Sequence, residues 1–541
     1  MGFPYFISYL PTLLLSAMYA LLSYKLLKQE SDFGKGKKFQ WAMLSAVYVL
    51  VMKGSFLVEY SASPDEHQWI FSARTFARDP WNWFKEFYPY EMSRSWTVIP
   101  LGLLACLVSE LTYVHARLLF MLFFMLNMGL LLMVMRKRFE ERHVCTAISW
   151  FTLLYAMTTY VDYAAYNSEM PALIFILISL CFLFRLQDST HLRSSALLLA
   201  ASSVFIPFAK EQALYISLLL WFLGLFFLVN KRFWMLTLQY ILVSVCAALL
   251  LISPLIFFGT VDVFFKNAMI AAQYQSNGFG MVEKDLINAS FVLYFFKLVF
   301  LNAMWFFPFL MLVFFAFVVL NNKGWNIKSS DMNGRRDGLV VILAIVVLLT
   351  IYLPRNGIKH YCIFMIPAVI WSVAFALDRW KDRRFLLAVM WILPFGIAVD
   401  PQFRKEIFPV RGYRTPEVIF ANDPVYQGMK AHVKPGSKVM IWGWANHYYN
   451  LFQCERCSHF LYPQFAFGFY KETDFVDQVY INDLQEFVPD YVVQAVGDGC
   501  FYFTDSVKCD MMKHDSTLAS ILREQYTLVY QHQGVKIYAH P

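Results

Sequence analysis

Long apolar runs dominate this sequence and limit what it can fold into. Runs of about twenty residues, the length that a helix needs to cross a membrane, recur from the N-terminus to about residue 400. Of the 541 residues, 59% are hydrophobic and only 16% are charged, which is unusual for a soluble domain. The chain is therefore predicted to be a mostly α-helical, polytopic membrane protein. About twelve spans are expected, at 4–24, 40–58, 114–135, 143–162, 170–184, 195–209, 213–230, 233–257, 291–320, 338–354, 361–377 and 385–399.

Basic residues are concentrated in alternate loops, which sets the predicted orientation. The segments after the first, third, fifth, seventh, ninth and eleventh spans hold 21 Lys and Arg residues, whereas the opposite loops are long and poor in them. The positive-inside rule places the basic segments in the cytoplasm and everything after residue 400 outside. Most of the formal charge of +8 is thus explained by membrane orientation, and no nucleic-acid partner is expected. No cleavable signal peptide is expected either, because 4–24 lacks a basic n-region.

The apolar stretch 97–112 resembles a short span, but we predict that it does not cross the membrane. A crossing there would invert every later loop and place the basic segments outside. We expect a juxtamembrane or re-entrant helix instead, so that 59–113 forms one large external loop with several short helices lying on the membrane. Residues 1–400, this loop included, are predicted to form a transmembrane catalytic domain.

After residue 400 the sequence becomes mixed and polar, which predicts a separate domain over 401–541. Strands are expected at 438–442 and 490–495, a helix at 423–432, and a closing hairpin, YTLVY–QHQG–VKIYA. The pattern predicts a small external α/β domain. Its four cysteines, an even number, suit disulfides in an oxidising compartment, with unknown connectivity. Zinc is the alternative, but their spacing is not a usual zinc pattern. The disulfide candidates are Cys454, Cys457, Cys500 and Cys509.

The segment 63–77 (SPDEHQWIFSARTFA) predicts an amphipathic helix that begins with two carboxylates. Ser63 is a suitable N-cap, Pro64 suits the first position, and Glu66 completes a capping box. Asp65 and Glu66 would then lie just outside a span, where a membrane enzyme can hold a catalytic base. The alternative interpretation is that both only stabilise the helix N-terminus.

Other ionisable residues are predicted on the same side of the membrane. Glu169 stands directly before an apolar helix, where stabilising the helix N-terminus is again the alternative. Lys210 lies between two apolar runs, a depth at which a charge indicates function, with snorkelling as the alternative. Lys53, inside a span, is expected to snorkel outward. The turn 354–361 (PRNGIKHY) adds three potential cations.

Together these residues suit a phosphate whose lipid tail lies in the bilayer. Cations at the lipid boundary can bind the phosphate. A neighbouring carboxylate can take the proton from an acceptor hydroxyl that attacks the sugar carbon bearing that phosphate.

In these motifs the chain resembles the GT-C membrane glycosyltransferases, in particular bacterial relatives of protein O-mannosyltransferases and of the lipid A aminoarabinose transferase. Pro64-Asp65-Glu66 is similar to the family's P-D-E motif, whose Asp is the proposed catalytic base. The similarity continues in order through Arg94, Ala116-Arg117-Leu118, Glu169, the segment 353–365 (LPRNGIKHYCIFM), and the tail elements IWGWANHYY, LYPQF and PDYVV.

The chain also departs from the family pattern. Gln68 stands where members often carry an Arg for the donor phosphate, an extra span precedes the Asp-bearing loop, and the W-W-D motif of oligosaccharyltransferases is absent. Phosphate binding is therefore left to other cations. The candidates are Arg74, Arg94, Lys210, Arg355 and His360.

The resemblance implies an inverting transfer of a sugar from a polyprenyl-phosphate donor to a lipid, glycan or protein acceptor. Asp65 would be the general base, and Glu66 or Glu169 would position the acceptor or a second proton. Some relatives bind a divalent metal, but no residues here have convincing ligand spacing, so no cofactor is expected. The expected location is the bacterial inner membrane, with the site and the C-terminal domain in the periplasm. The alternative function is a transporter or flippase for a lipid-linked glycan.

Overall fold

The computed structural model describes the chain except for residues 1–3, 29–33, 58–63, 159–162, 164, 277–302, 322–331, 353–358, 380–418, 461–472, 498–499 and 501–508. The chain divides into two compact units. The first unit consists of Met1–Val58, Arg117–Leu250 and Asp285–Tyr413, and the second of Glu59–Ala116, Leu251–Lys284 and Arg414–Pro541. The large external loop therefore belongs with the C-terminal domain, whereas the sequence predicted a boundary at residue 400.

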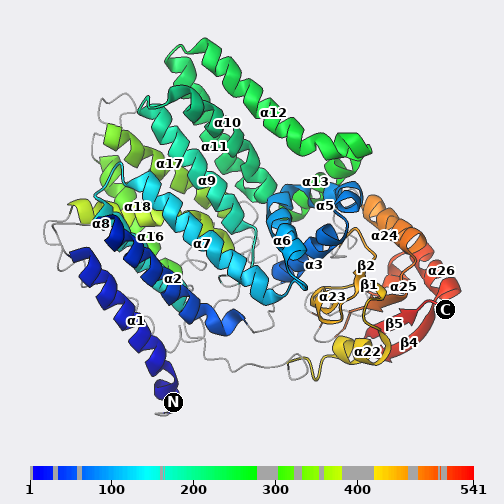
Figure 1. The fold of residues 1–541 in the computed structure, drawn as a ribbon. Coiled ribbons are helices and arrows are strands. Elements are labelled where there is room, and N and C mark those ends of the chain that lie inside the picture. Colours follow the sequence, from blue (N-terminus) through cyan, green and yellow to red (C-terminus); the bar gives the residue numbers. More distant parts are fainter. Residues whose placement is uncertain are drawn as a thin grey trace. The chain divides into compact units, whose positions relative to one another are not determined.

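The first unit is a bundle of helices (Figure 1). Those that belong wholly or mostly to it are α1 (Pro4–Lys28), α2 (Lys35–Leu57), α7 (Tyr113–Met135), α8 (Glu141–Met157), α9 (Glu169–Gln187), α10 (Leu192–Ala209), η4 (Glu211–Ala213), α11 (Leu214–Asn230), α12 (Trp234–Phe258), α16 (Ala303–Asn321), α17 (Met332–Tyr352), η6 (Lys359–Met365) and α18 (Ile366–Arg379).

The described helices make this an integral membrane protein, but they do not confirm twelve spans. Six segments are long and apolar enough to cross a membrane: Tyr113–Met135, Glu169–Gln187, Leu192–Ala209, Glu211–Asn230, Trp234–Phe258 and Tyr361–Arg379. All six coincide with predicted spans. The last predicted span, 385–399, lies outside the described residues.

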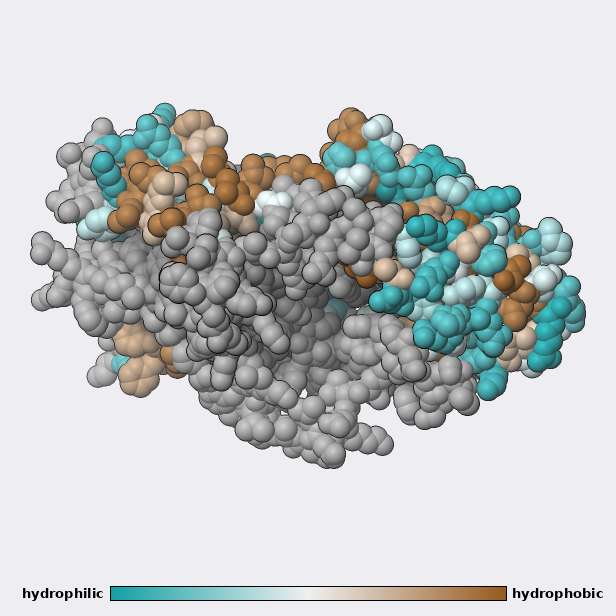
Figure 2. Space-filling model, turned by 90° about the horizontal axis from the view of Figure 1, so that it is seen from below, coloured by the Kyte–Doolittle hydropathy of each residue, from teal (hydrophilic) through white to brown (hydrophobic). Residues whose placement is uncertain are grey.

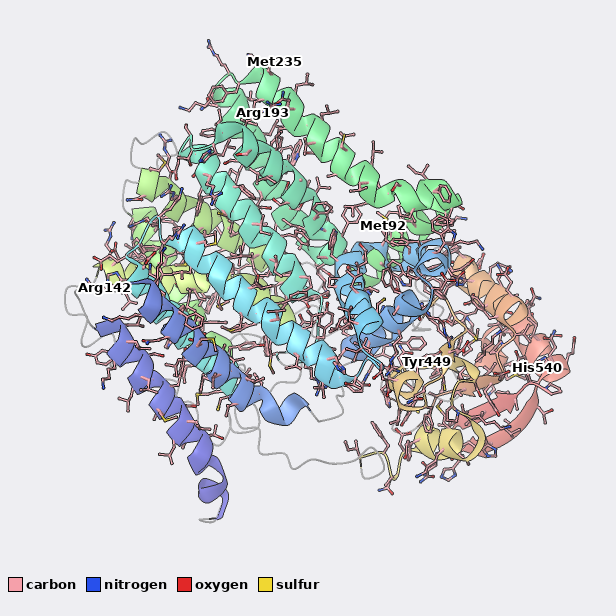
Figure 3. All side chains as sticks on the ribbon, in the orientation of Figure 1. Met92, Arg142, Arg193, Met235, Tyr449 and His540 are labelled. Carbon is pink, nitrogen blue, oxygen red and sulfur yellow. The ribbon has the colours of Figure 1, made fainter. Side chains whose placement is uncertain are left out.

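The core of the first unit is formed around α8 and α18. Every residue from Ile366 to Leu377 in α18 is buried, as expected for a helix that is apolar on all sides. In the middle of α18, the Trp371 indole donates to Asp337 Oδ1 at 2.9 Å, and Arg138 Nη2 lies 2.9 Å from Asp337 Oδ2. Arg138 belongs to one of the basic loops that set the predicted orientation. At least one of those cations therefore also joins helices. Arg142 and Arg193, two other cations of the predicted basic segments, lie in the first turns of α8 and α10 (Figure 3).

The second unit combines short helices with one sheet. Its elements are α3 (Pro64–Arg78), α4 (Pro80–Asn82), η1 (Trp83–Phe87), α5 (Tyr88–Glu91), η2 (Met92–Arg94), α6 (Ser95–Leu107), α13 (Val261–Ser276), α22 (Pro424–His432), β1 (Lys438–Trp442), α23 (His447–Leu451), β2 (Glu455–Arg456), α24 (Thr473–Phe487), β3 (Tyr491–Gln494), α25 (Met511–His514), α26 (Ser516–Gln525), β4 (Thr527–His532) and β5 (Val535–Ala539).

The five strands form a mixed sheet in the order β2-β1-β3-β5-β4. β1 runs parallel to β2 and β3, while β5 is antiparallel to β3 and β4. Side chains alternate across the sheet: Met440 and Trp442 join one buried cluster, and Val439 and Ile441 join the other. The sequence predicted β1, the closing hairpin and α22 correctly. Figure 2 shows that the visible surface of this C-terminal domain is mostly hydrophilic.

The apolar stretch 97–112 forms a helix too short to span a membrane. α6 has 13 residues, and it packs against α3 in the same unit. Gly102 permits this approach, because a Cβ there would lie 2.4 Å from the Phe76 ring. The prediction of a short helix at this position is confirmed.

Cys454 and Cys457, two of the four disulfide candidates, carry thiols in the structure. The sheet separates some of them, since Cys454 lies in the cluster on one face and Cys509 in the cluster on the other. Burial raises the pKa of Cys454 and of Cys457 to about 12.

Candidate functional site

Two carboxylates begin α3, as the sequence predicted. The helix starts at Pro64 and holds Asp65 and Glu66 in its first turn. Glu66 is fully buried, whereas Asp65 is partly exposed. A carboxylate in the first turn is favoured by the helix dipole. The N-cap, Ser63, lies outside the described residues. Partial exposure leaves Asp65 able to meet a substrate while Glu66 is part of the packed interior.

Helix α23 packs on this turn of α3 and fixes its position. Asn450 Nδ2 donates to the His67 carbonyl at 3.2 Å, and the rings of His67 and His447 lie 5.2 Å apart. Further along, Tyr449, labelled in Figure 3, stacks on Phe71 at 4.4 Å. The element that places Asp65 is thus a helix almost four hundred positions later in the chain, as the 383-residue separation of the Asn450–His67 bond shows.

A glycine turn delivers α23 to this position. Gly443 follows β1 with φ +146°, and a Cβ there would lie 2.3 Å from the Ala495 carbonyl oxygen. Only glycine fits such a close approach with this backbone angle. The Tyr449 hydroxyl then accepts a hydrogen bond from the Ile441 amide at 2.9 Å, which ties α23 back to β1.

A buried ion pair joins the external loop to the C-terminal domain. Glu91 Oε1 lies 2.6 Å from Arg456 Nη1, and both side chains are 2% exposed. Ser72 and Trp83 also donate to the Glu91 carboxylate, at 2.7 and 3.1 Å. Arg456 donates further to the carbonyls of Ser458 and His459. This set of partners satisfies both buried charges.

A second polar group, on His459, reinforces the same junction. His459 Nδ1 lies 2.5 Å from Asp483 Oδ1, and Nε2 lies 3.5 Å from Glu86 Oε2. Burial alone would lower the pKa of His459, but the two carboxylates outweigh it and raise the pKa to about 9. The hydrogen bond with His459 lowers the pKa of Glu86 to about 2 despite burial. Sequence reasoning missed both networks, because nothing in the spacing links these residues.

Two predicted phosphate ligands in the second unit have protein partners. Arg74 donates to the Leu111 carbonyl at 2.6 Å and lies 3.4 Å from Glu110 Oε1. The Arg94 guanidinium lies 5.5 Å from the centre of the Trp69 ring. Both contacts hold the external loop together, so phosphate binding by either residue stays a prediction.

In the first unit, Glu169 and Lys210 form an ion pair. It is the most buried ion pair among the predicted site residues. Lys210 Nζ lies 2.9 Å from Glu169 Oε1, and the side chains are 4% and 0% exposed. Glu169 begins α9, while Lys210 is the extended residue between α10 and η4. Snorkelling of Lys210, the alternative interpretation, is wrong for this structure. A buried pair of charges in an apolar bundle is costly unless it serves a function.

Tyr361 completes this group and was not predicted as a site residue. Lys210 Nζ lies 5.0 Å from the centre of the Tyr361 ring, and Gln212 Nε2 donates to the Tyr361 hydroxyl at 3.1 Å. The side chain of His360, its neighbour in η6, and the whole of Arg355 lie outside the described residues. The proximity of Tyr361 to the His360 motif was the only sequence signal for it.

Lys53 does not snorkel outward, which corrects the sequence prediction. Its side chain is fully buried and Nζ donates to the Thr158 carbonyl at 2.6 Å, directly after the end of α8. An ammonium group satisfies a carbonyl that the helix leaves without an intrahelical partner.

Comparison with known proteins gives similarity to solved structures alone. No protein-family profile matches the chain, and no curated protein does. The chain is similar to the Archaeoglobus fulgidus oligosaccharyltransferase tethered to an acceptor peptide (TM-score 0.48, 12% identity, 95% of this chain and 75% of that one). It is also similar to ArnT from Cupriavidus metallidurans bound to undecaprenyl phosphate (TM-score 0.48, 15% identity, 92% of this chain and 98% of that one).

Both of these structures belong to the GT-C class that the sequence motifs resemble. At these TM-scores and identities, the likeness does not by itself assign this chain to a family or give it a substrate. Among the residues that the structure describes, no group of three or more His, Cys, Asp or Glu side chains is placed to hold a metal ion.

Proposed function

We propose that the protein is an inverting glycosyltransferase that moves a sugar from a polyprenyl-phosphate donor to an acceptor outside the membrane. The observation that carries this proposal is the buried Glu169–Lys210 pair, 2.9 Å apart at the ends of apolar helices. Charges at such a depth are retained when they serve a ligand, and an ammonium group suits the phosphate of a lipid-anchored donor. Glu169 would orient Lys210 in the absence of that phosphate.

Asp65 is the proposed general base. Its carboxylate would take the proton of the acceptor hydroxyl while the hydroxyl oxygen bonds to C1 of the donor sugar. The bond between C1 and the phosphate oxygen breaks in the same step, and polyprenyl phosphate leaves with the electron pair. Attack opposite to the leaving group inverts the configuration at C1. Lys210, with Arg94, Arg355 or His360, would neutralise the leaving phosphate.

The proposed setting is the bacterial inner membrane, with catalysis on the periplasmic side. The basic loops after alternate spans support this orientation, since they would lie in the cytoplasm. Which sugar is transferred depends on side chains that contact the donor head group, and the proposal covers hexoses and pentoses alike.

The test measures release of polyprenyl phosphate from a panel of polyprenyl-phosphate sugars, with the full chain in lipid nanodiscs. Asp65→Asn is expected to lower release at least 100-fold, because the amide cannot accept the proton. Asp79→Asn is the matched control: Asp79 is exposed in the same loop, and Asn can keep its N-cap bond to Asn82.

Release that survives Asp65→Asn would move the base to Glu66 or Glu169. Absence of release with every donor, together with flipping of a lipid-linked glycan across the bilayer, would replace the transferase with the flippase.

A further inference from the structure

Helix α23 presents a row of polar side chains next to the turn that carries Asp65. The sequence there is Asn446-His447-Tyr448-Tyr449-Asn450, and all five lie within the second unit. Tyr449 is used in packing, since it stacks on Phe71 and accepts the Ile441 amide proton. Asn446, His447 and Asn450 each have a side-chain polar atom that the packing does not use.

These unused polar atoms are buried. Asn446 is 2% exposed, and neither its amide oxygen nor its amide nitrogen has a hydrogen-bond partner in the structure. Asn450 Oδ1 and His447 Nε2 are also buried without partners. The Tyr448 hydroxyl is directed to the Asp423 carboxylate. Proteins rarely bury an amide with both ends unsatisfied, because the group loses its hydrogen bonds to water. Three residues with unsatisfied buried polar atoms at the start and end of one short helix, Asn446, His447 and Asn450, indicate that something else hydrogen-bonds to them.

The unpaired groups are electrically neutral. Burial lowers the pKa of His447 to about 4, against a weaker opposing effect of the Asp423 carboxylate, so the ring is uncharged at neutral pH. Asn and Tyr side chains carry no charge there either. A phosphate or carboxylate prefers charged donors. Neutral groups that both donate and accept suit hydroxyls, which also do both. The ring of Phe420 stacks on His447 at 5.1 Å and adds an apolar wall.

The group lies next to the turn of α3 that carries Asp65. His67, which contacts both His447 and Asn450, is two residues after Asp65 in α3. Residues two apart leave a helix on different sides. A molecule held by α23 would therefore lie next to the turn of α3 that carries Asp65.

We propose that Asn446, with His447 and Asn450, binds the hydroxyl groups of a neutral sugar unit of the acceptor, one unit away from the reacting hydroxyl. This inference rests on the proposed glycosyl transfer and deepens it. The acceptor is then a glycan of at least two sugars, in contrast to a bare lipid phosphate or an unmodified peptide.

The test measures binding directly, with the full chain in nanodiscs and without a donor. The probes are a panel of neutral disaccharides, each as its methyl glycoside, and a hexose 1-phosphate for comparison. Binding is followed by saturation-transfer NMR and by calorimetric titration. At least one neutral disaccharide is expected to bind to the wild type, and more tightly than the hexose phosphate.

Asn446→Leu separates a binding role from a structural one, because Leu has nearly the shape of Asn but no polar atoms. We expect the variant to bind the disaccharide at least tenfold more weakly than the wild type. Its melting temperature should be equal or higher, since it removes an unsatisfied buried amide. Asn482→Ala, at an exposed position on α24, is the control and should change neither quantity.

Three results would overturn the inference: no neutral disaccharide binds the wild type, Asn446→Leu binds as tightly as the wild type, or the hexose phosphate binds more tightly. These results are distinct from a failure of the proposed function. Loss of donor release in Asp65→Asn, with no disaccharide binding, would leave the transferase in place and remove the sugar subsite. Disaccharide binding without any donor release would keep the sugar subsite and remove the transferase.

Discussion

Arg456 and Glu91 form a buried ion pair across 365 positions of sequence, with 2.6 Å between Nη1 and Oε1. The pair joins the C-terminal domain to the loop that carries Asp65. Arg456→Met leaves Glu91 buried with one charge unpaired, so it is expected to lower the free energy of unfolding by about 3–5 kcal/mol. Thermal and urea unfolding in detergent measure this, with Arg523→Met at an exposed position of α26 as the control.

The double variant Glu91→Leu/Arg456→Met removes both charges. It is expected to be more stable than Arg456→Met alone, because no isolated charge stays buried. A double variant that is no more stable than the single one would contradict this account of the pair.

Lys210 is expected to act on the donor rather than on the fold. Lys210→Met should lower kcat/KM for the polyprenyl-phosphate donor by about 100-fold, which corresponds to about 2.7 kcal/mol of transition-state stabilisation. The single variant also leaves Glu169 buried and unpaired, which destabilises the protein. Glu169→Gln/Lys210→Met should therefore recover thermal stability and not activity. Recovery of both would make the pair purely structural, and Lys231→Met, at an exposed residue, is the control.

His459 makes stability depend on pH in a defined direction. Its pKa is about 9 in the folded protein, above the value near 6.5 of an unfolded chain, so the folded state binds the proton more tightly. The contribution, on the order of 3 kcal/mol, is complete below about pH 6.5 and disappears as the pH rises through about 9. The melting temperatures of wild type and His459→Gln should differ most near pH 6 and converge near pH 10. A difference that grows with pH would refute the assignment.

Cys454 and Cys457 are expected to be thiols that react slowly. Both are buried, and burial raises the pKa of each to about 12, so little thiolate forms at pH 8. Iodoacetamide should modify them in the unfolded chain much faster than in the folded protein, as measured by peptide mass spectrometry. Detection of either residue in a disulfide-linked peptide from the native protein would restore the sequence prediction.

Local patterns in the sequence predicted local structure well. Pro64 marked the first residue of α3, and the short apolar run KVMIW gave the bounds of β1, because capping and strand-forming composition depend on neighbouring residues. The orientation argument also kept 97–112 from being counted as a span, and α6 is a short helix there.

Partners distant in sequence could not be predicted in the same way. Nothing around Arg456 indicates that its carboxylate partner lies in the first external loop, and no periodicity connects α23 with His67. Lys53 shows the same limit: its sequence fits snorkelling, but the Thr158 carbonyl, directly after α8, accepts its hydrogen bond inside the bundle. The candidate carboxylates were thus found from sequence, whereas the groups that hold and surround them came from tertiary structure.

The packing of α23 on α3 has a consequence for how this protein can be taken apart and recombined. A chimera cut at residue 400 would keep Asp65 and lose the helix that holds its turn in place. Exchange between this chain and a similar protein should therefore move 59–116 and 414–541 together, as one cassette. Over evolutionary time, we expect these two stretches to change together. The acceptor that they bind is expected to change with them.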